Sequence, residues 1–464
     1  MSQVLTLPQK RKRSARGGEE QVEIVVHLEV VTPILGGATA PRTVDEIDVI
    51  RVPTIRGHLR FWWRAMERQK HETSADLFAA ESALWGRAAD PKGGRSAVEL
   101  TVAVEDKGDI DDDDIRLYPK GGQPATQGAY AVWPARAETR ENKPTAPRRA
   151  PGTRFRLKAT CPKAHASEVR AAIAAWILFG GYGGRTRRGL GSLAVDVAAE
   201  REAWLPKALT RAEFERVFGR DVLKADAAAA PADIPVLSGA SLHGGLPVAD
   251  PEAAWTTALA WLRDFRQKDG AGDGFAREPG ADNRRPGRSN WPESDKVRQL
   301  AGSGPWAHKP RHNATPVWPR AGFGLPIIGQ FQGRDRTGQP YRDNEPRPFT
   351  LVWKKGSAGH DRLASPLIVK AIPLADGRFV PAALWLNRGY PDGGKVGLQE
   401  GAPISGSGPA LKRGSEAAFD DLVAPGDKPL SKWLAAGAGA PQGQRLRTAF
   451  CAWLAEVKQV KEVR

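Results

Sequence analysis

The sequence has few cysteines and no long apolar run, which are the features of disulfide-bonded, zinc-binding and membrane-spanning proteins. It contains only two cysteines, Cys161 and Cys451, which lie far apart and belong to no spaced motif. Disulfide scaffolds and cysteine-based zinc sites need several closely spaced cysteines, so neither is expected. No apolar run approaches the roughly 18 residues of a membrane span, and residues 1–20 lack the apolar segment of a secretory signal. We therefore expect a cytoplasmic protein with no membrane partner.

Acidic residues are also in deficit. The 464 residues include 69 Lys and Arg against 53 Asp and Glu, which gives a formal net charge of +16. This excess favours a polyanionic partner, with nucleic acid ahead of an anionic membrane. Residues 1–20, with the run from Lys10 to Arg13, are expected to be a disordered basic arm; the alternative is a targeting address.

The most distinctive stretch is rich in glycine and arginine. Residues 179–192, which we call the Gly-Arg loop, hold six glycines, three arginines and no acidic residue. Glycine permits backbone conformations with φ > 0 and the close approach of another segment, and the arginine fork fits phosphate oxygens. The loop is thus suited to the backbone of a polyanion. The alternative is a solvated turn with incidental arginines.

The segments on either side of the Gly-Arg loop exclude the common nucleotide-binding loops. Apolar residues from Val169 to Ile177 recur at helical spacing, and those from Leu193 to Val197 alternate as in a strand. The order is therefore helix, loop, strand, whereas ATP-binding and dinucleotide-binding loops lie between a strand and a helix. Gly189 is also followed by Leu-Gly and not by Lys-Ser or Lys-Thr. ATPase and Rossmann functions are excluded, and no cofactor is expected.

The first half of the chain has the pattern of an α+β fold. Alternating apolar residues predict strands at 22–30, 98–104, 155–159 and 193–197, and helical spacing predicts helices at 54–66 and 166–179. The resulting order, β-α-β-β-α-β, is that of the ferredoxin-like fold, which RNA-recognition modules share. The aromatic signatures of those modules are absent, so we expect RNA to bind at the Gly-Arg loop and the first helix rather than on the sheet.

The helix predicted at 54–66 has two stripes of side chains. The apolar stripe, which faces the core, consists of Ile55, Leu59, Trp62 and Met66. The second stripe, on what we expect to be an exposed edge, consists of Arg56, Arg60, Trp63 and Arg64. Arginines and an indole on one edge suit phosphates and a stacked base. The alternative is a solvated face with a partly buried tryptophan.

Two clusters of polar residues have some features of metal sites. Residues 106–152 form an insertion with four consecutive aspartates from Asp111 to Asp114. Adjacent carboxylates cannot converge on one ion without ligands from elsewhere, so an acidic surface loop is expected. His308 and His312 have the spacing of helical zinc ligands, but Pro310 argues against a helix, and no further ligand completes the set. No metal site is predicted.

Six motifs between residues 22 and 370 form a recognisable set. The first half has Thr-Pro-Ile-Leu-Gly-Gly from Thr32, Arg-Gly-His-Leu-Arg-Phe-Trp-Trp-Arg from Arg56, and the Gly-Arg loop. The second half has Arg-Ser-Asn-Trp-Pro-Glu from Arg288, Ala-Gly-Phe-Gly-Leu-Pro-Ile from Ala321, and Arg-Leu-Ala-Ser-Pro-Leu-Ile from Arg362. Together they resemble the RAMP superfamily of CRISPR proteins and, more closely, the first Cmr subunit of type III-B effector complexes.

The resemblance implies two ferredoxin-like RAMP domains with insertions. The first would span residues 21–200 with its insertion at about 106–152, and the second 201–464 with a mobile segment at about 269–290. The Gly-Arg loop would connect the second helix and the fourth strand of the first domain. Residue patterns alone do not yield a second β-α-β-β-α-β series, so the second domain is an expectation from the resemblance.

The resemblance also implies a function. The chain would be a non-catalytic RNA-binding subunit of an RNA-guided, RNA-targeting effector complex in antiviral defence, located near the 3′ end of the guide. Its partners would be guide CRISPR RNA, target RNA and other Cmr RAMP subunits. The candidate RNA-binding residues are Arg56, His58, Arg60, Trp63, Arg64, Gly183, Gly184, Arg185, Thr186, Arg187, Arg188, Arg284, Arg285 and Arg288.

The alternative function is a metal-independent endoribonuclease that processes guide RNA. Related RAMP proteins use a histidine as general acid or base on a 2′-hydroxyl, and His58 lies among the arginines of the first helix. Neighbouring charges would shift its pKa as such chemistry requires. No second acid or base is identifiable nearby, so we expect His58 to have a binding or structural role and the chain not to be an enzyme.

Overall fold

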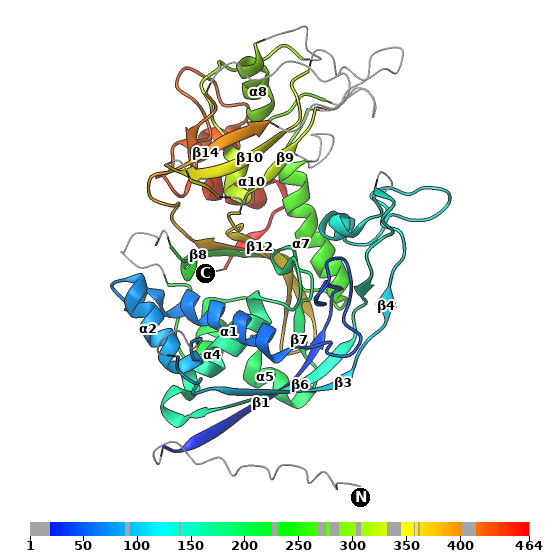
Figure 1. Cartoon of the computed structure of the whole chain (residues 1–464), viewed down its shortest axis with the longest axis vertical. Helices are drawn as coiled ribbons and strands as arrows, with labels where there is room; N and C mark the ends of the chain where they lie inside the picture. Colours follow the sequence, from blue (N-terminus) through cyan, green and yellow to red (C-terminus); the bar gives the residue numbers. More distant parts are fainter. Residues whose placement is uncertain are drawn as a thin grey trace, which may run out of the picture.

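Three antiparallel sheets follow one another along the long axis of the molecule in the computed structural model (Figure 1). The structure describes residues 19–88, 93–138, 141–224, 231, 233–267, 275–278, 287–302, 308–331, 345–356, 358–360, 362–400 and 414–463. The predicted α+β class is confirmed. No helix in the described part of the chain is long and apolar enough to cross a membrane.

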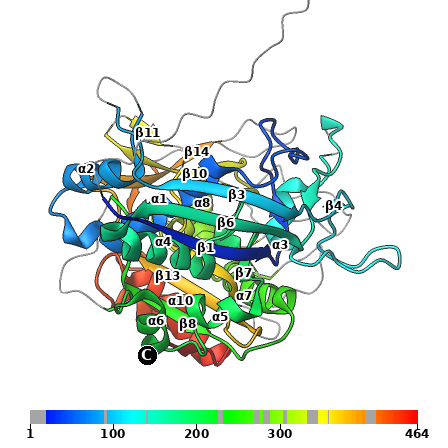
Figure 2. The same ribbon diagram turned by 90° about the horizontal axis from the view of Figure 1, so that it is seen from below.

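The first sheet and its two helices have the β-α-β-β-α-β order. The elements are β1 (Gln21–Val30), α1 (Val52–Glu67), β3 (Glu99–Asp106), β6 (Thr153–Pro162), α4 (Ala166–Phe179) and β7 (Leu193–Val195). We call them the first unit. The sheet order is β3-β6-β1-β7, with every pair antiparallel (Figure 2). Val26, Leu28 and Val30 alternate along β1 and are fully buried, since they face the helices.

The second sheet repeats this topology. Its elements, which we call the second unit, are β8 (Val236–Gly244), α7 (Pro251–Arg266), β12 (Leu367–Pro373), β13 (Phe379–Asn387), α10 (Arg445–Val457) and β16 (Lys461–Glu462). The sheet order, β12-β13-β8-β16, places the strands as in the first unit. Two long insertions, between α7 and β12 and between β13 and α10, separate consecutive elements. This interruption explains why the repeat is not visible in the sequence.

The two units stack in four layers. Helices α1 and α4 lie between the first sheet and the second (Figure 1), and Leu242, Ile368 and Leu384 of the second sheet belong to their core. The other face of the second sheet packs on α7 and α10, where Trp255 and Trp453 are fully buried. A single pair of helices therefore provides the core for both sheets.

The two insertions of the second unit come together as the third sheet. Its order is β11-β10-β14-β15, with β9 also paired to β10. The elements are α8 (Glu293–Ala301), β9 (Ile327–Gly329), β10 (Phe349–Lys355), β11 (Ala358–His360), β14 (Gly394–Glu400) and β15 (Ala417–Ala418). Trp318 and Leu351 lie in its separate small core.

The remaining helices and strands surround the units. They are α2 (Ser74–Trp85), α3 (Ala129–Val132), α5 (Ala198–Trp204), α6 (Arg211–Phe218), α9 (Lys432–Ala438), β2 (Ile34–Leu35), β4 (Ile110–Asp111) and β5 (Arg148–Arg149). The insertion of the first unit holds β4, α3 and β5, and β5 pairs with both β2 and β4.

The Gly-Arg loop follows α4 and closes on itself before β7. The amide of Tyr182 donates to the carbonyl of Gly191 over 2.8 Å, and the amide of Gly191 donates to Pro33 over 2.9 Å. Gly191 has φ +62°, and a Cβ atom there would lie 1.8 Å from the Tyr182 carbonyl oxygen. Glycine is therefore required at this position by both backbone conformation and space.

We expect Gly191→Ala to lower the free energy of unfolding by about 3 kcal/mol, because the methyl group clashes with backbone that is itself hydrogen-bonded. Gly219→Ala is the matched control: Gly219 has φ +71° but no neighbouring atom within 4 Å of an added Cβ. It should cost only about 1 kcal/mol of backbone strain. Urea unfolding measures both values, and equal losses would contradict the close approach at Gly191.

Candidate nucleic-acid interface

The Gly-Arg loop lies between the two units and contacts both. The Nε1 of Trp255, on α7, donates to the carbonyl of Arg188 over 2.7 Å. A Cβ atom on Gly189 would lie 2.4 Å from the Trp255 ring and 2.8 Å from the Val369 carbonyl of β12. Leu190 is fully buried. The loop backbone thus packs directly on the second unit, and a side chain at position 189 would separate them.

A buried lysine of the second unit binds the carboxyl end of α4. The ammonium of Lys370, on β12, donates to the carbonyls of Ile177 over 2.9 Å and Gly180 over 2.8 Å. These carbonyls belong to the end of a helix, where backbone acceptors lack helical partners and the dipole favours a cation. Burial without a carboxylate lowers the pKa of Lys370 to about 7.

Five arginines from both units gather around the loop. We call them the junction arginines: Arg185, Arg187 and Arg188 of the loop, Arg266 at the end of α7, and Arg388 after β13. Three of them donate to neutral acceptors: Arg187 to the carbonyl of Ser365, Arg388 to that of Ala364, and Arg266 to the hydroxyl of Tyr130. None of the five forms an ion pair with a carboxylate of the described residues.

Burial and mutual repulsion act on these guanidinium groups. Burial, followed by the charge of Arg266, lowers the pKa of Arg188 to about 9, and burial, followed by the charge of Arg388, lowers that of Arg187 to about 10. Both groups remain charged at neutral pH. Cations that are desolvated without an opposite charge are costly, so the site is electrostatically incomplete without an anion.

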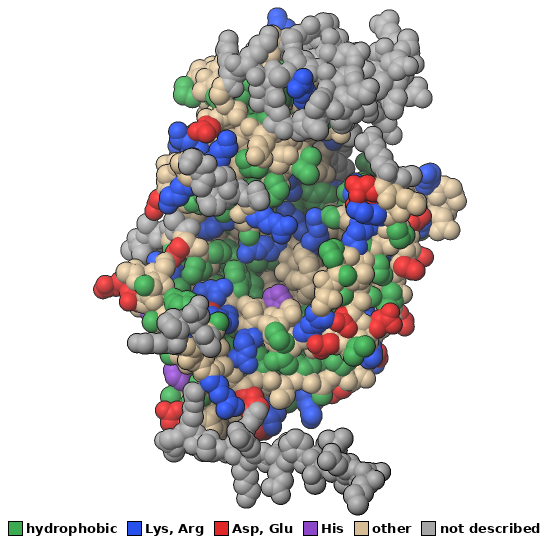
Figure 3. All heavy atoms as spheres, viewed as in Figure 1, with side chains coloured by type: hydrophobic (Ala, Val, Ile, Leu, Met, Phe, Trp, Pro, Cys, Tyr) green, Lys and Arg blue, Asp and Glu red, His purple; other side chains and the backbone are tan. Residues whose placement is uncertain are grey.

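The molecular surface around the junction is also rich in positive charge. Lys and Arg side chains gather around a hollow across the middle of the face in Figure 3, at the height of α1 and β12 in Figure 1. The acidic side chains on this face lie mainly toward its periphery. Phe61 of α1 also belongs to this region, because the Arg187 guanidinium lies 5.5 Å from its ring centre.

The second stripe of α1 is placed differently from the prediction. Trp63 is buried, with its Nε1 donating to Glu168 over 2.9 Å, so the prediction of an indole on an exposed edge is wrong. Arg60 and Arg64 are half-buried and both bind the buried carboxylate of Glu81. The indole of Trp63 is buried between α1 and α4. Arg60 and Arg64 instead lie beside α2, which supplies the carboxylate that pairs with them.

Arg56 differs from its two neighbours on α1. Its guanidinium donates to the hydroxyl of Ser96 over 2.7 Å and to the carbonyl of Val98 over 3.1 Å, and it pairs with no carboxylate of the residues that the structure describes. Burial, with a smaller contribution from Arg60, lowers its pKa. Of the three predicted arginines of α1, Arg56 is thus the one whose charge is not offset.

His58 is held among aromatic rings rather than arginines. Its imidazole stacks on Trp176 with ring centres 6.1 Å apart and contacts Tyr182 edge-on at 6.3 Å. Burial alone lowers its pKa to about 4, so the explanation from neighbouring arginines is wrong. At neutral pH the imidazole is uncharged and has little tendency to take up a proton.

The other loop residues with predicted roles lie at the surface of the junction. Gly184 is exposed, and its amide donates to the carbonyl of Leu35 over 2.7 Å. Gly183 has φ +89° and packs on Ile34, so both glycines bring the loop close to β2. Thr186 begins the short 3₁₀ turn of Thr186–Arg188 and is half-buried.

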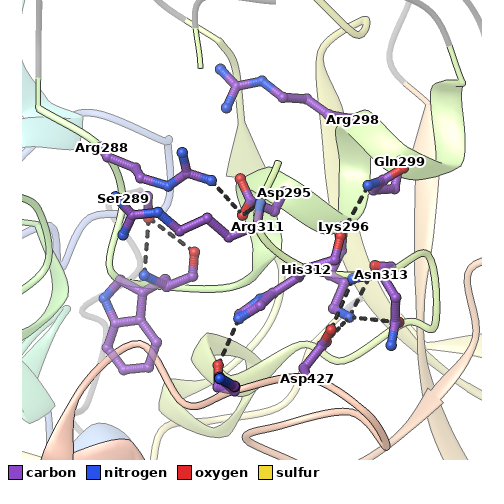
Figure 4. A network of polar contacts seen from close by, with 12 residues as sticks. Arg288, Ser289, Asp295, Lys296, Arg298, Gln299, Arg311, His312, Asn313 and Asp427 are labelled. Carbon is purple, nitrogen blue, oxygen red and sulfur yellow. Dashed lines mark hydrogen bonds and ion pairs between the residues drawn. The ribbon is translucent and has the colours of Figure 1, made fainter. Parts of the chain in front are cut away.

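Arg288 lies away from the junction, in a polar network that joins the two insertions of the second unit (Figure 4). Its guanidinium pairs with the buried Asp295 over 2.9 Å, and the adjacent Lys296 is fully buried against Asp427 and Asn313. His312 belongs to the same network, with its Nε2 3.0 Å from the Lys428 carbonyl oxygen. These contacts give Arg288 a structural role. Arg284 and Arg285 lie outside the described residues.

Sequence reasoning missed three residues that the second unit contributes. Arg266 is the last residue of an amphipathic helix, Arg388 follows a buried strand, and Lys370 lies within one. None belongs to a glycine-rich or arginine-rich motif. The charge of Lys370 inside the buried strand Leu367–Pro373 is the one anomaly in the sequence that indicates a special environment.

Comparison with known protein families shows what the first unit is similar to. Residues 27–194 match the family model described as the RAMP superfamily, which confirms the predicted resemblance over that range. No curated protein matches the chain significantly.

Solved structures that match the chain include the apo form of Cmr1 from Pyrococcus furiosus. It is 14% identical, with a TM-score of 0.44, over 84% of this chain and 93% of that chain. Two chains of type III-B Cmr-beta complexes bound to cognate target RNA also match. One is 11% identical with a TM-score of 0.40, and the match covers 79% of this chain and 95% of that chain. The other is 10% identical with a TM-score of 0.44, and the match covers 94% of this chain and 100% of that chain.

The buried ammonium of Lys370 predicts a pH dependence of stability. Its pKa is about 7 in the folded chain against an ordinary 10.5, so between these values the unfolded chain binds the extra proton. Stability should therefore rise with pH across this window, by up to about 1.4 kcal/mol per pH unit, relative to Lys370→Met. Urea unfolding from pH 6 to 10 measures the slopes. Lys120→Met, at an exposed position, should keep the wild-type slope, and an unchanged slope in Lys370→Met would contradict the assignment.

Proposed function

We propose that this chain, whose residues 27–194 match the RAMP superfamily, is a non-catalytic RNA-binding subunit of a type III-B CRISPR effector complex. The observation that carries the proposal is the set of five junction arginines with no carboxylate partner. A polyanion that lies across the two units would supply the missing negative charge. The two units correspond on this view to two ferredoxin-like RAMP domains, and the complex acts in the cytoplasm in antiviral defence.

The residues around the junction favour recognition of the RNA backbone rather than of base identity. Guanidinium groups bind phosphate oxygens in any sequence, and the one indole predicted to stack on a base, Trp63, is buried. The open face of the first sheet carries cross-strand ion pairs, Lys158 with Glu23 and Arg154 with Asp106, in place of aromatic rings. Guide and target RNA, which differ in sequence between complexes, both fit such a surface.

The revised set of RNA-binding residues keeps Arg56, Gly183, Gly184, Arg185, Thr186, Arg187 and Arg188 and adds Arg266 and Arg388. The residues set aside are Trp63, which is buried, and Arg60, Arg64 and Arg288, which have carboxylate partners. This division follows from charge balance, since an arginine already paired to a carboxylate gains less from a phosphate.

The properties of His58 support a role without catalysis. A general acid or base works best with a pKa near the working pH, and burial lowers the pKa of His58 to about 4. Trp176 and Tyr182 are its ring neighbours, and neither is a proton-transfer partner at neutral pH. We assign the half-buried His58 a structural role through its ring contacts with Trp176 and Tyr182.

We expect Arg185→Ala/Arg187→Ala to weaken RNA binding at least about tenfold at moderate salt and to reduce the slope of log affinity against log salt by about two, because two phosphate contacts are lost. Arg154→Ala/Arg156→Ala, which removes the same charge from the open face of the first sheet, is the matched control. Fluorescence anisotropy with a guide-length RNA measures both. Equal losses in the two variants would show that net charge, and not the junction, determines affinity.

Purification of the tagged chain from its host tests the assembly. Recovery of CRISPR guide RNAs together with other RAMP subunits is the expected result. Recovery of the chain alone, with cleavage of repeat RNA that depends on the 2′-hydroxyl and disappears in His58→Ala, would replace the proposal with the nuclease function.

A further inference from the structure

Two junction arginines, Arg188 and Arg266, have buried donor atoms without hydrogen-bond acceptors among the described residues. The guanidinium of Arg188 makes no hydrogen bond with the described residues, although its Nη1 is completely buried. The Nε of Arg266 is also buried without a partner, while its Nη1 donates to the hydroxyl of Tyr130 over 3.1 Å. After burial, the charge of Arg266 has the largest effect on the pKa of Arg188 and lowers it. Tyr130 raises this pKa, and Arg185 lowers it.

These groups come from three separate segments. Arg188 and Arg185 belong to the Gly-Arg loop of the first unit, Arg266 ends α7 of the second unit, and Tyr130 lies on α3 in the insertion of the first. The loop is held in this place by the bond from Trp255 to the Arg188 carbonyl. The arrangement is therefore built by the fold and does not result from chance contacts of flexible side chains.

We propose that Arg188, Arg266 and Tyr130, with Arg185 at the rim, form a site for a single phosphate group. A buried donor without an acceptor costs free energy, and like charges held together cost more. An anion with several oxygens satisfies both demands, because each guanidinium donates through a planar fork and the phenol donates through its hydroxyl. The Arg266 guanidinium also lies 5.3 Å from the Phe323 ring centre, and this cation–π contact orients the group without using its Nε as a donor.

The number and spread of the donors favour phosphate over a carboxylate or chloride. Three guanidinium groups carry three positive charges, so a terminal phosphate with close to two negative charges balances them better than a singly charged anion, and an internal phosphodiester still offers more than one oxygen to the donors. A phosphate presents up to four oxygens to donors that approach from different segments. That the phosphate belongs to RNA rests on the proposed function, whereas the anion site itself does not.

The bound phosphate would join the two units. It would contact the loop of the first unit and α7 of the second at the place where Gly189 packs on Trp255 and β12. An RNA held through this group is consequently bound by both units at once.

Thermal unfolding of the full chain in inorganic phosphate, against chloride at equal ionic strength, tests the site directly. Wild type should gain about 3 °C in Tm at phosphate concentrations well above Kd, and Arg188→Met and Arg266→Met should lose this gain. Arg156→Met, which removes an exposed arginine of β6, is the control and should keep it. In chloride alone, Arg188→Met should be at least as stable as wild type, because it removes an unbalanced buried cation. No specific gain in wild type, or an undiminished gain in Arg188→Met, would overturn the site.

RNA binding then distinguishes the source of the phosphate and separates this inference from the proposed function. If the phosphate is terminal, wild type should bind an RNA with the matching 3′- or 5′-phosphate more tightly than the unphosphorylated RNA, and Arg188→Met should not. If it is internal, Arg188→Met should bind all three RNAs more weakly, with a salt slope lower by about one. Unchanged binding of all three by Arg188→Met would sink the RNA-phosphate assignment while the proposed function stands. A phosphate-dependent Tm gain in a wild-type chain that binds no RNA would leave the anion site and refute the proposed function.

Discussion

The close approach of the Gly-Arg loop to the second unit is the constraint on which the rest of the structure depends. Gly189 allows the loop backbone to lie against Trp255 and β12, and Lys370 reaches back to the end of α4 from the other side. These contacts fix the relative position of two units that share the α1–α4 layer as a common core. They also bring arginines from both halves of the chain within reach of one another.

The junction shows how the functional surface arises from structural requirements. A loop between two layers must be rich in glycine to fit, and glycines alone would leave it without binding groups. The arginines interspersed among them extend from a backbone whose position is already determined, so their guanidinium groups are preorganised. The second unit adds Arg266 and Arg388 and offers carbonyls as acceptors, and the first unit offers the phenol of Tyr130, in place of carboxylates. The positive charge is therefore retained for a ligand.

Local pattern predicted the first unit well and the second poorly, for a physical reason. The alternation of Val26, Leu28 and Val30 and the helical spacing around Trp176 reflect burial against neighbours that are close in sequence. In the second unit β8 and β12 are separated by an insertion with its own sheet, so no local pattern links them. The pairing of β12 with β13, by contrast, joins strands that are neighbours in the sequence. Among site residues, the Gly-Arg loop was found by composition, whereas Trp63 was misplaced because its partner Glu168 lies on another helix.

The order of strands in the second sheet affects when each unit can fold during synthesis. The last described strand, β16, pairs with β8 at the edge of this sheet, and α10 packs on the sheet only after both insertions have been made. The first unit can fold as it leaves the ribosome, but the second remains open until α10 and β16 have been made. During that interval Arg187 and Arg188 have no second unit to pack on, and the half-built surface lacks Arg388. The junction arginines of both units therefore come together only after the segment up to β16 has been synthesised.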